Sequence, residues 1–354
     1  MESDEKNNSS SFPIGETAQE KGLSHVPEAY EVPSSQRPSL EPETADVPLI
    51  DLNGLRCGGA ADRRGAIVEE IGQACRRYGF FQVVNHGIDQ AVLEGALSAA
   101  SDFFSLPAPE KIKFFSNDVH KPVRYASSLK DGVDTIQFWR IFLKHYAHPL
   151  GDWINSWPAN PPTYREEMGR YAMEVRKLGL ELMEAITESL GIGPKYTSDK
   201  MEQGMQVMAI NCYPPCPQPS LALGLPPHSD YSCLTVLLQS FAGLEIFDSK
   251  DGQWQLVPDV DGALQVHVGN HLEVLSNGRF KSVVHRASLH HEKTRISIAS
   301  LHSLAMDEKM GTAMELVDEE HPKGYKESSL RDFLDFLAKH DLGQGKSFIK
   351  SLQI

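Results

Sequence analysis

The sequence lacks an apolar run long enough to cross a bilayer, and no secretory signal peptide is visible at its start. Acidic residues are frequent near the N-terminus, whereas organelle transit peptides are poor in acids. Cysteine is also scarce: five among 354 residues is an odd number, which does not suggest a disulfide scaffold. We therefore expect a cytoplasmic protein whose cysteines stay reduced.

Basic residues are too few to form a surface for polyanions. The chain has 34 lysines and arginines against 48 acids, a formal net charge of −14, and shows no basic cluster. Nucleic acids and anionic membranes reward clustered positive charge, so both are disfavoured as partners. We expect a monomer that acts on a small-molecule substrate.

Composition and apolar periodicity divide the chain into a flexible tail, a mainly helical part that packs on the core, the core itself and a C-terminal helical segment. In order, these are residues 1–46, 47–205, 206–303 and 304–354. The tail is expected because this stretch is rich in Ser, Glu, Pro and Asn and has few large apolar side chains to bury. The helical part opens with a β–α–β pattern, with strands at 47–52 and 79–88, and its clearest helix is expected from Tyr164 to Leu190.

Between Gln206 and Leu301 the pattern changes to short alternating runs separated by turn residues. Eight runs are expected to be strands: MQVMAINCY, CLTVLLQ, GLEIF, WQLV, ALQVHV, LEVL, RFKSVVHRA and RISIASL. So many short strands favour an antiparallel jelly roll over a parallel sheet, and the fold class is therefore mixed α+β. In the C-terminal segment an amphipathic helix is expected to begin near Ser328 or Ser329, with Asp332 at a capping position.

His228 and Asp230 stand two positions apart at the start of an apolar strand, so both side chains would point to the same face. The spacing alone is weak evidence, because two other histidines of the chain also have an acid two positions on. A third partner is His285, in an alternating strand segment 57 residues after His228. Two imidazoles and one carboxylate on one rim of a barrel form a facial triad, which leaves iron positions open for other molecules.

A second group of polar residues suggests an anion-binding site. In TRISIASL, strand alternation places Arg295 and Ser297 on one face. The planar guanidinium can hold a carboxylate through two hydrogen bonds, and the adjacent hydroxyl could add a third. Alternation also places Asn211 and Tyr213 on a shared face, from which the phenol could donate to the same anion. A salt bridge from Arg295 to one of the many acids is the alternative.

These residues occur in an ordered set of motifs that resembles the plant soluble 2-oxoglutarate- and Fe(II)-dependent dioxygenases, from about Val47 to the C-terminus. The motifs are GFFQVVNHGI at 79–88, NCYPPCPQP at 211–219, HSD at 228–230, EVLSNGRFKSVVHR at 273–286 and RIS at 295–297. Within that family the chain is most similar to the flavanone 3-hydroxylase-like and downy-mildew-resistance-like oxygenases.

The resemblance implies a double-stranded β-helix (jelly-roll) core in which the two histidines and the aspartate of the triad bind Fe(II). It also implies that Arg295 and Ser297 bind 2-oxoglutarate, with Tyr213 assisting and Asn211 nearby. The expected reaction consumes 2-oxoglutarate and O2, hydroxylates a substrate carbon and releases succinate and CO2; ascorbate is an expected stimulant.

Two departures from the family pattern concern the surroundings of the metal and the substrate. Many relatives have Asp after the Gly of V-x-V-G, where this chain has Asn270 and then His271, so the hydrogen bonds around the ligands are expected to differ. Flavonoid-modifying relatives often have Phe six residues after the arginine, where this chain has Leu301. The aliphatic residue removes a stacking surface and weakens a flavonoid assignment.

A helical segment expected at FWRIFLKH offers Phe142 and Lys144 as walls of the substrate pocket, with Tyr125 before it as a further candidate. For this segment, an amphipathic core helix with an exposed lysine is the alternative.

We expect the substrate to be a small, mostly apolar, aromatic plant metabolite or hormone: a flavanone, a phenolic acid such as salicylate, or an indole such as melatonin. Two other functions stay open. One is an iron oxidase of the same fold that does not consume 2-oxoglutarate, as in the ethylene-forming relatives. The other is a non-catalytic jelly-roll binding protein whose metal is structural or vestigial.

Overall fold

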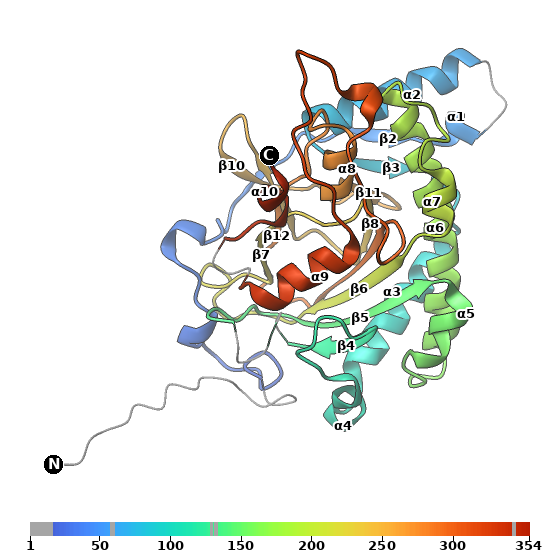
Figure 1. The fold of residues 1–354 in the computed structure, drawn as a ribbon. Helices are drawn as coiled ribbons and strands as arrows, with labels where there is room; N and C mark the ends of the chain where they lie inside the picture. Colours follow the sequence, from blue (N-terminus) through green and yellow to red (C-terminus); the bar gives the residue numbers. More distant parts are fainter. Residues whose placement is uncertain (1–16, 57–60, 128–129, 131–133, 342–344) are drawn as a thin grey trace.

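The strands form two sheets in the computed structural model, which describes residues 17–56, 61–127, 130, 134–341 and 345–354 (Figure 1). The larger sheet contains, in spatial order, β2 (Leu49–Asp51), β3 (Phe80–Val84), β11 (Leu264–Val268), β8 (Leu234–Gln239), β13 (Arg295–His302), β6 (Gln206–Tyr213), β5 (Ile141–His148) and β4 (Val123–Ala126). The smaller sheet contains β1 (Glu43–Thr44), β10 (Gln253–Leu256), β9 (Leu244–Asp248), β12 (His285–Ala287) and β7 (Leu225–His228).

Helices flank these sheets; in Figure 1, α6 runs down the right side of the strands and α9 lies in front of them. The α-helices are α1 (Asn53–Arg56), α2 (Ala61–Arg77), α3 (Gln90–Ser105), α4 (Ala108–Lys111), α5 (Leu150–Trp153), α6 (Tyr164–Ser189), α7 (Ser198–Glu202), α8 (Asn270–Leu275), α9 (Leu330–Lys339) and α10 (Phe348–Leu352). Short 3-10 helices are η1 (Glu28–Tyr30), η2 (Ser34–Gln36), η3 (Ile112–Phe114), η4 (Ile154–Ser156) and η5 (Met314–Leu316).

The mixed α+β architecture expected from the sequence is confirmed. β2 and β3 pair in parallel with α2 between them in the chain, as the β–α–β pattern predicts. Seven of the eight runs expected as strands between residues 206 and 302 contain strands, and these divide between the two sheets as in a jelly roll.

The two clearest helices form for the reasons expected. α6 buries an apolar stripe at spacings of three and four, including Met168, Val175 and Leu182, and packs on α2 and α3. α9 begins with a capping box in which the Ser329 hydroxyl accepts a hydrogen bond from the backbone N–H of Asp332, and the Asp332 carboxylate accepts from the backbone N–H of Ser329.

Two sequence expectations about secondary structure are wrong. The segment FWRIFLKH is not helical, because Ile141–His148 is strand β5. Both faces of β5 are covered, so its sequence lacks the alternation of a half-exposed strand. The run LEVL is not a strand: it lies in α8, in which all six residues are buried, and a short apolar run buried on all sides cannot be assigned by periodicity.

The expectation of a flexible tail at residues 1–46 is also wrong for residues 17–46, which pack on the core. Val26, Tyr30 and Val32 are buried, and the ring of Tyr30 meets that of Trp139 edge to face at 5.5 Å. Arg286 Nη1 donates to the carbonyl of Gln36 at 3.0 Å, which ties the segment to the core. A few well-placed side chains suffice because the core supplies the other half of each contact; residues 1–16 lie outside the described residues.

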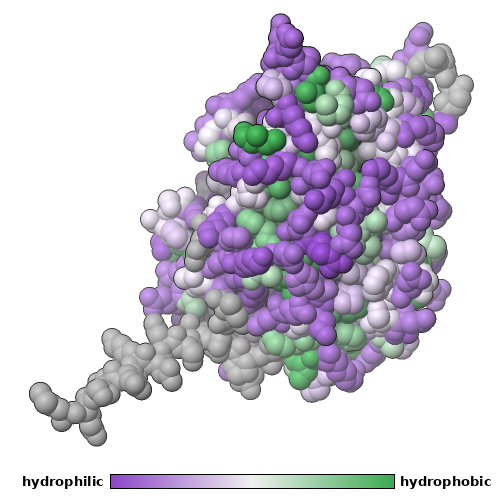
Figure 2. All heavy atoms as spheres, in the orientation of Figure 1, coloured by the Kyte–Doolittle hydropathy of each residue, from purple (hydrophilic) through white to green (hydrophobic). Residues whose placement is uncertain are grey.

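On the face shown in Figure 2, hydrophilic residues predominate and apolar residues show between them. Within the described ranges, no helix is both long and apolar enough to pass through a membrane. The segment boundaries at 205 and 303 stay predictions, and the larger sheet takes strands from both sides of residue 205.

A buried ion pair joins β9 to β12 and gives a first test of the fold. Arg286 Nε donates to Glu245 Oε2 at 2.6 Å, and both side chains are almost fully buried. We expect Glu245→Ala to lower the free energy of unfolding by about 3–5 kcal/mol, because it leaves a buried guanidinium without its carboxylate. Chemical denaturation measures this.

The matched control for this test is Glu174→Ala, which breaks an exposed pair with Lys177 on α6. We expect this variant to lose no more than about 0.5 kcal/mol. Equal losses in the two variants would contradict the role given to the buried pair.

Candidate active site

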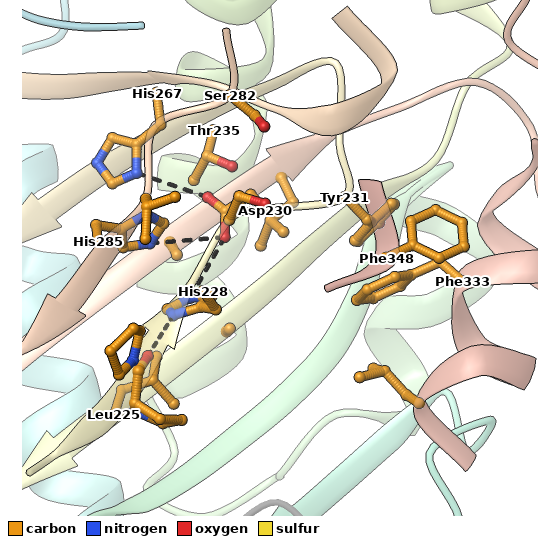
Figure 3. Close-up of a pocket in the computed structure, with 18 of the residues that line it drawn as sticks. Leu225, His228, Asp230, Tyr231, Thr235, His267, Ser282, His285, Phe333 and Phe348 are labelled. Carbon is orange, nitrogen blue, oxygen red and sulfur yellow. Dashed lines mark hydrogen bonds and ion pairs between the residues drawn. The ribbon is translucent and has the colours of Figure 1, made fainter. Parts of the chain in front are cut away.

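A cavity of about 620 Å³ lies between residues of the two sheets and the C-terminal helices. β5, β6 and β13 of the larger sheet line one part of it, and β7 and β12 of the smaller sheet line another. Phe333 and Phe348, from α9 and α10, lie across the cavity from a cluster of histidines and Asp230 (Figure 3). The cavity thus combines an apolar wall with polar side chains, among them these histidines and Asp230.

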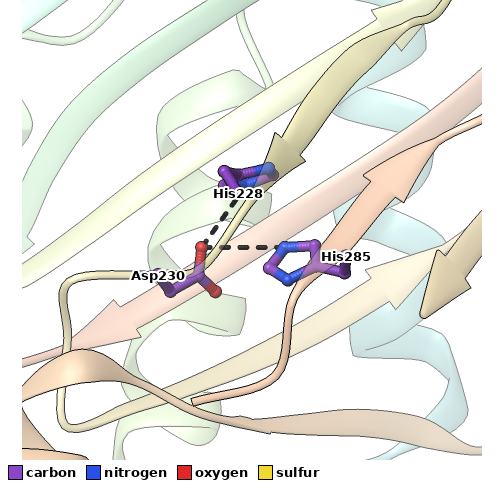
Figure 4. Close-up of side chains that lie close together, drawn as sticks. All are labelled: His228, Asp230 and His285. Atoms are coloured by element: carbon purple, nitrogen blue, oxygen red, sulfur yellow. Dashed lines mark ion pairs between the residues drawn. The ribbon is translucent and has the colours of Figure 1, made fainter. Parts of the chain in front are cut away.

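His228, Asp230 and His285 lie together at this cavity, although 57 residues separate the two histidines. β7 and β12 are antiparallel neighbours in which His228 and His285 are directly opposite. One potential ligand atom from each of the three residues lies within 4.8 Å of the others. Asp230 Oδ1 is 3.7 Å from His228 Nε2 and 3.8 Å from His285 Nε2 (Figure 4).

Backbone carbonyls orient the two imidazoles. His228 Nδ1 donates to the carbonyl of Pro226 at 2.8 Å, and His285 Nδ1 donates to that of Val283 at 3.2 Å. Because a carbonyl can only accept, the proton is on Nδ1 and the Nε2 lone pair faces the cluster. A backbone partner on the other ring nitrogen is typical of metal-binding histidines.

The protonation states also suit a cation. Burial lowers the pKa of His228 and of His285, so both rings are neutral at neutral pH. Burial alone would raise the pKa of Asp230, but the interaction with His285, the hydrogen bond with His267 and the proximity of His228 together hold this pKa well below its usual value. Two neutral imidazoles and one carboxylate are a donor set that fits Fe(II) with positions left open.

His267 is a residue of the site that the sequence reasoning missed. It is 1% exposed on β11, its Nδ1 lies 3.6 Å from Asp230 Oδ2, and its ring centroid is 4.7 Å from that of His285. It lies outside the group of three whose ligand atoms converge. A signal was present, since the alternation in ALQVHV places His267 and Gln265 on one face of an apolar strand.

The two residues that depart from the family pattern lie behind the triad. Asn270 Oδ1 accepts from the hydroxyl of Ser229 at 2.8 Å, and the backbone N–H of Asn270 donates to the carbonyl of Asp230 at 2.8 Å. Asn270 therefore holds the turn that carries Asp230. His271 is buried between the hydroxyls of Ser303, at 3.3 Å, and Ser328, at 3.2 Å.

The expected anion-binding residues are neighbours across β13 and β6. Arg295 pairs with Tyr213 and Ser297 with Asn211, and all four line the cavity. The Arg295 guanidinium lies 5.1 Å from the centre of the Tyr213 ring and donates to Gln239 Oε1 at 2.8 Å. This arrangement leaves the guanidinium on the cavity wall beside a phenol and a hydroxyl.

Three of the four expected pocket residues line the cavity, namely Leu301, Phe142 and Lys144. Tyr125 does not, and that expectation is wrong. It is fully buried on the other face of β4, where the centre of its ring lies 6.2 Å from that of Phe103 in an edge-to-face contact. The cavity wall is instead formed by its neighbour Arg124 and by Arg140, which the sequence reasoning did not single out.

Comparisons with known proteins agree with this geometry. Residues 204–303 match the family model of the 2OG-Fe(II) oxygenase superfamily, and residues 47–160 match that of the non-haem dioxygenase in morphine synthesis N-terminal region. Flavanone 3-dioxygenase 3 of Oryza sativa subsp. japonica is 49% identical over 91% of this chain and 98% of its own length. The 2-oxoglutarate-dependent dioxygenase 21, chloroplastic, of the same organism is 50% identical over 90% of this chain and 94% of its own.

A solved structure extends the comparison to the fold. The crystal structure of JOX2 in complex with 2OG, Fe and JA has a TM-score of 0.82 and 29% identity, and the match covers 95% of this chain and 96% of that one.

Proposed function

Because this chain belongs to the 2-oxoglutarate- and Fe(II)-dependent oxygenase superfamily, we propose that it hydroxylates a small, mostly apolar, aromatic metabolite. The enzyme is a dioxygenase that uses Fe(II), 2-oxoglutarate and O2. In the proposed reaction one oxygen atom enters the substrate, the other enters succinate, and CO2 leaves. The observation that supports the proposal most is the convergence of two neutral imidazoles and a carboxylate at one end of a largely apolar cavity.

In this proposal His228, Asp230 and His285 hold the iron. When bound, the ion supplies the activation of dioxygen and a docking point for the 2-oxo acid. The protein's own contribution is to fix the donors, through the carbonyls behind the imidazoles and through Asn270 behind the turn at Asp230. The apolar side chains of α9 and α10 exclude water from the same cavity.

We assign the distal carboxylate of 2-oxoglutarate to Arg295 and Ser297, with Tyr213 and Asn211 beside them. A fixed guanidinium fork holds a carboxylate through two parallel hydrogen bonds. Gly243 supports this placement: a Cβ there would lie 2.7 Å from Arg295 Cδ, so only glycine leaves room for this side chain.

We expect Arg295→Lys to raise the concentration of 2-oxoglutarate needed for half-maximal rate by about 10- to 100-fold, because an ammonium cannot replace a two-pronged, charge-assisted contact. The measurement is the dependence of succinate release on 2-oxoglutarate. Arg279→Lys, an exchange at an exposed arginine, is the control. An unchanged requirement in Arg295→Lys would remove this assignment.

Coupled turnover tests the proposal directly. The iron-loaded protein is incubated with flavanones, phenolic acids such as salicylate and indoles such as melatonin, and succinate and oxidised product are measured together. We expect a one-to-one ratio of the two with at least one compound class. Product without succinate would favour an oxidase that does not use 2-oxoglutarate, and no turnover with any compound would favour a binding protein.

The proposal also includes a monomeric, cytoplasmic enzyme that ascorbate stimulates. A rice relative carries the word chloroplastic in its name, so cell fractionation is the appropriate check of the location. Size-exclusion chromatography with light scattering checks the monomer.

A further inference from the structure

His267 is a buried histidine of β11 with few polar contacts. The residue is 1% exposed, and among the described residues neither ring nitrogen has a partner at ordinary hydrogen-bond distance. Its cross-strand neighbours are Phe80 and Thr235. A buried polar group without close partners costs free energy, so an apolar side chain would stabilise the strand more at this position. The imidazole therefore calls for an explanation other than packing.

The two oxygens of the Asp230 carboxylate face different groups. Oδ1 lies 3.7 Å from His228 Nε2 and 3.8 Å from His285 Nε2. Oδ2 lies 3.6 Å from His267 Nδ1 (Figure 3). Oδ1 is thus the oxygen that converges with the two imidazoles of the triad, and Oδ2 is the oxygen that faces His267.

The contact between His267 and Asp230 has a defined direction. A carboxylate oxygen can only accept, so the proton in this contact is on His267 Nδ1. A close hydrogen bond from N–H to a carboxylate is about 2.7–2.9 Å long, so a shift of less than about 1 Å would bring these atoms to that distance. The present separation is therefore that of a long hydrogen bond with room to shorten.

The imidazole of His267 is held more firmly than the carboxylate that it faces. β11 lies between β3 and β8 in the larger sheet, so its backbone is paired on both sides. The ring centroid of His267 is 5.2 Å from that of Phe80 and 4.7 Å from that of His285. Asp230, in contrast, follows the end of β7 and lies in a turn. A ring fixed by a central strand can therefore set the orientation of a carboxylate on a turn.

We propose that His267 is a positioning residue: its Nδ1 donates to Asp230 Oδ2 and keeps Oδ1 directed at the point where the ligand atoms of the triad converge. Outer hydrogen-bond partners of this kind fix the orientation of metal ligands. This inference rests on the proposed function, because it gives His267 a role at the same metal site.

The affinity of the full chain for Mn(II), measured by isothermal titration calorimetry, tests this role without turnover. We expect His267→Leu to bind Mn(II) about 10- to 100-fold more weakly, the usual effect of losing an outer partner of a metal ligand. The same variant should be at least as stable as the wild type in chemical denaturation, because leucine replaces a poorly paired polar group. A histidine with a merely structural role would give the opposite pair of results.

Two amide variants at the same position show which ring nitrogen matters. The amide nitrogen of asparagine is as many bonds from Cβ as Nδ1 of histidine, whereas that of glutamine is one bond further, as is Nε2. His267→Asn should therefore bind Mn(II) nearly as well as the wild type, and His267→Gln should not. His302→Leu, at a buried histidine of β13 that does not line the cavity, is the control and should leave Mn(II) binding unchanged.

An unchanged affinity for Mn(II) in His267→Leu would overturn the inference, and so would equal affinities in the asparagine and glutamine variants. If His267→Leu does not unfold cooperatively, the two amide variants decide. Mn(II) binding that depends on His267, with no succinate release from any substrate, would contradict the proposed function alone. Substrate-dependent succinate release in the wild type, with unchanged Mn(II) affinity in His267→Leu, would contradict the positioning role alone.

Discussion

Replacing His228 or Asp230 by alanine is expected to abolish substrate-dependent succinate release while the protein still unfolds in one cooperative transition. Each replacement removes one of three donor atoms that lie within 4.8 Å of one another. We expect a fall in turnover well beyond the roughly 10- to 100-fold that loss of an outer hydrogen-bond partner of a metal ligand causes. Succinate release measures activity, and chemical denaturation measures the fold.

The matched control is Glu292→Ala, because Glu292 also stands two positions after a histidine but is exposed and outside the converging group. This variant should keep its activity. Full activity in either triad variant would remove the assignment of the iron ligands, and so would equal losses in Glu292→Ala.

Replacing Lys144 by methionine is expected to make the protein more stable, by about 2–4 kcal/mol at pH 7. The pKa of Lys144 falls from its ordinary 10.5 to about 7 on folding, chiefly because of burial. Unfolding therefore takes up a proton between these pH values, which destabilises the wild-type fold. The loss of folding free energy caused by the buried ammonium is therefore complete below about pH 7 and disappears as the pH approaches 10.5.

The difference in unfolding free energy between Lys144→Met and the wild type should accordingly shrink between pH 7 and pH 10. Arg124 from β4, Asp118 and Tyr146 are the other charged or titratable groups near the ammonium, and all of them remain in the variant. Lys323→Met, at an exposed lysine, should show no such trend. A difference that stays constant with pH would show that the ammonium is not disfavoured by folding.

The grouping of the three proposed iron ligands could be predicted from the sequence because these residues carry local signals. His228 and Asp230 stand at strand spacing, and His285 lies in an alternating segment. The strand pairing that brings the histidines opposite each other carries no local signal, because it depends on the register of β7 and β12. The proximity of His228 and His285 was predicted from the resemblance to the family motifs.

Burial on both faces explains what the sequence could not show. In β5, Leu143 packs into the main core while Phe142 and Lys144 face the cavity. Because both faces of the strand are covered, its sequence does not alternate between apolar and polar residues. Tyr125 was misplaced for a related reason, since the cavity-facing side of β4 is known only once β4 pairs with β5. Adjacent residues of a strand point to opposite faces, so Tyr125 lies in the core while its neighbour Arg124 lines the cavity.

Composition was similarly misleading for the N-terminal stretch. Its buried side chains are sparse, so the average over residues 1–46 resembles that of a chain with no core. Tyr30 becomes buried in a cluster with Trp139, Cys216 and Ala222, which lie far from it in the sequence. The composition of the N-terminal stretch does not reveal contacts that it makes with distant parts of the chain.

The opposed histidines of β7 and β12 restrict how these two strands can vary. Each imidazole comes from a different strand, so an inserted or deleted residue in either strand would turn one ring to the opposite face of the sheet. Related chains can therefore exchange side chains around the iron more freely than they can change strand length. Differences in length should gather in the connecting loops, and diversity in substrate choice should come from the cavity wall.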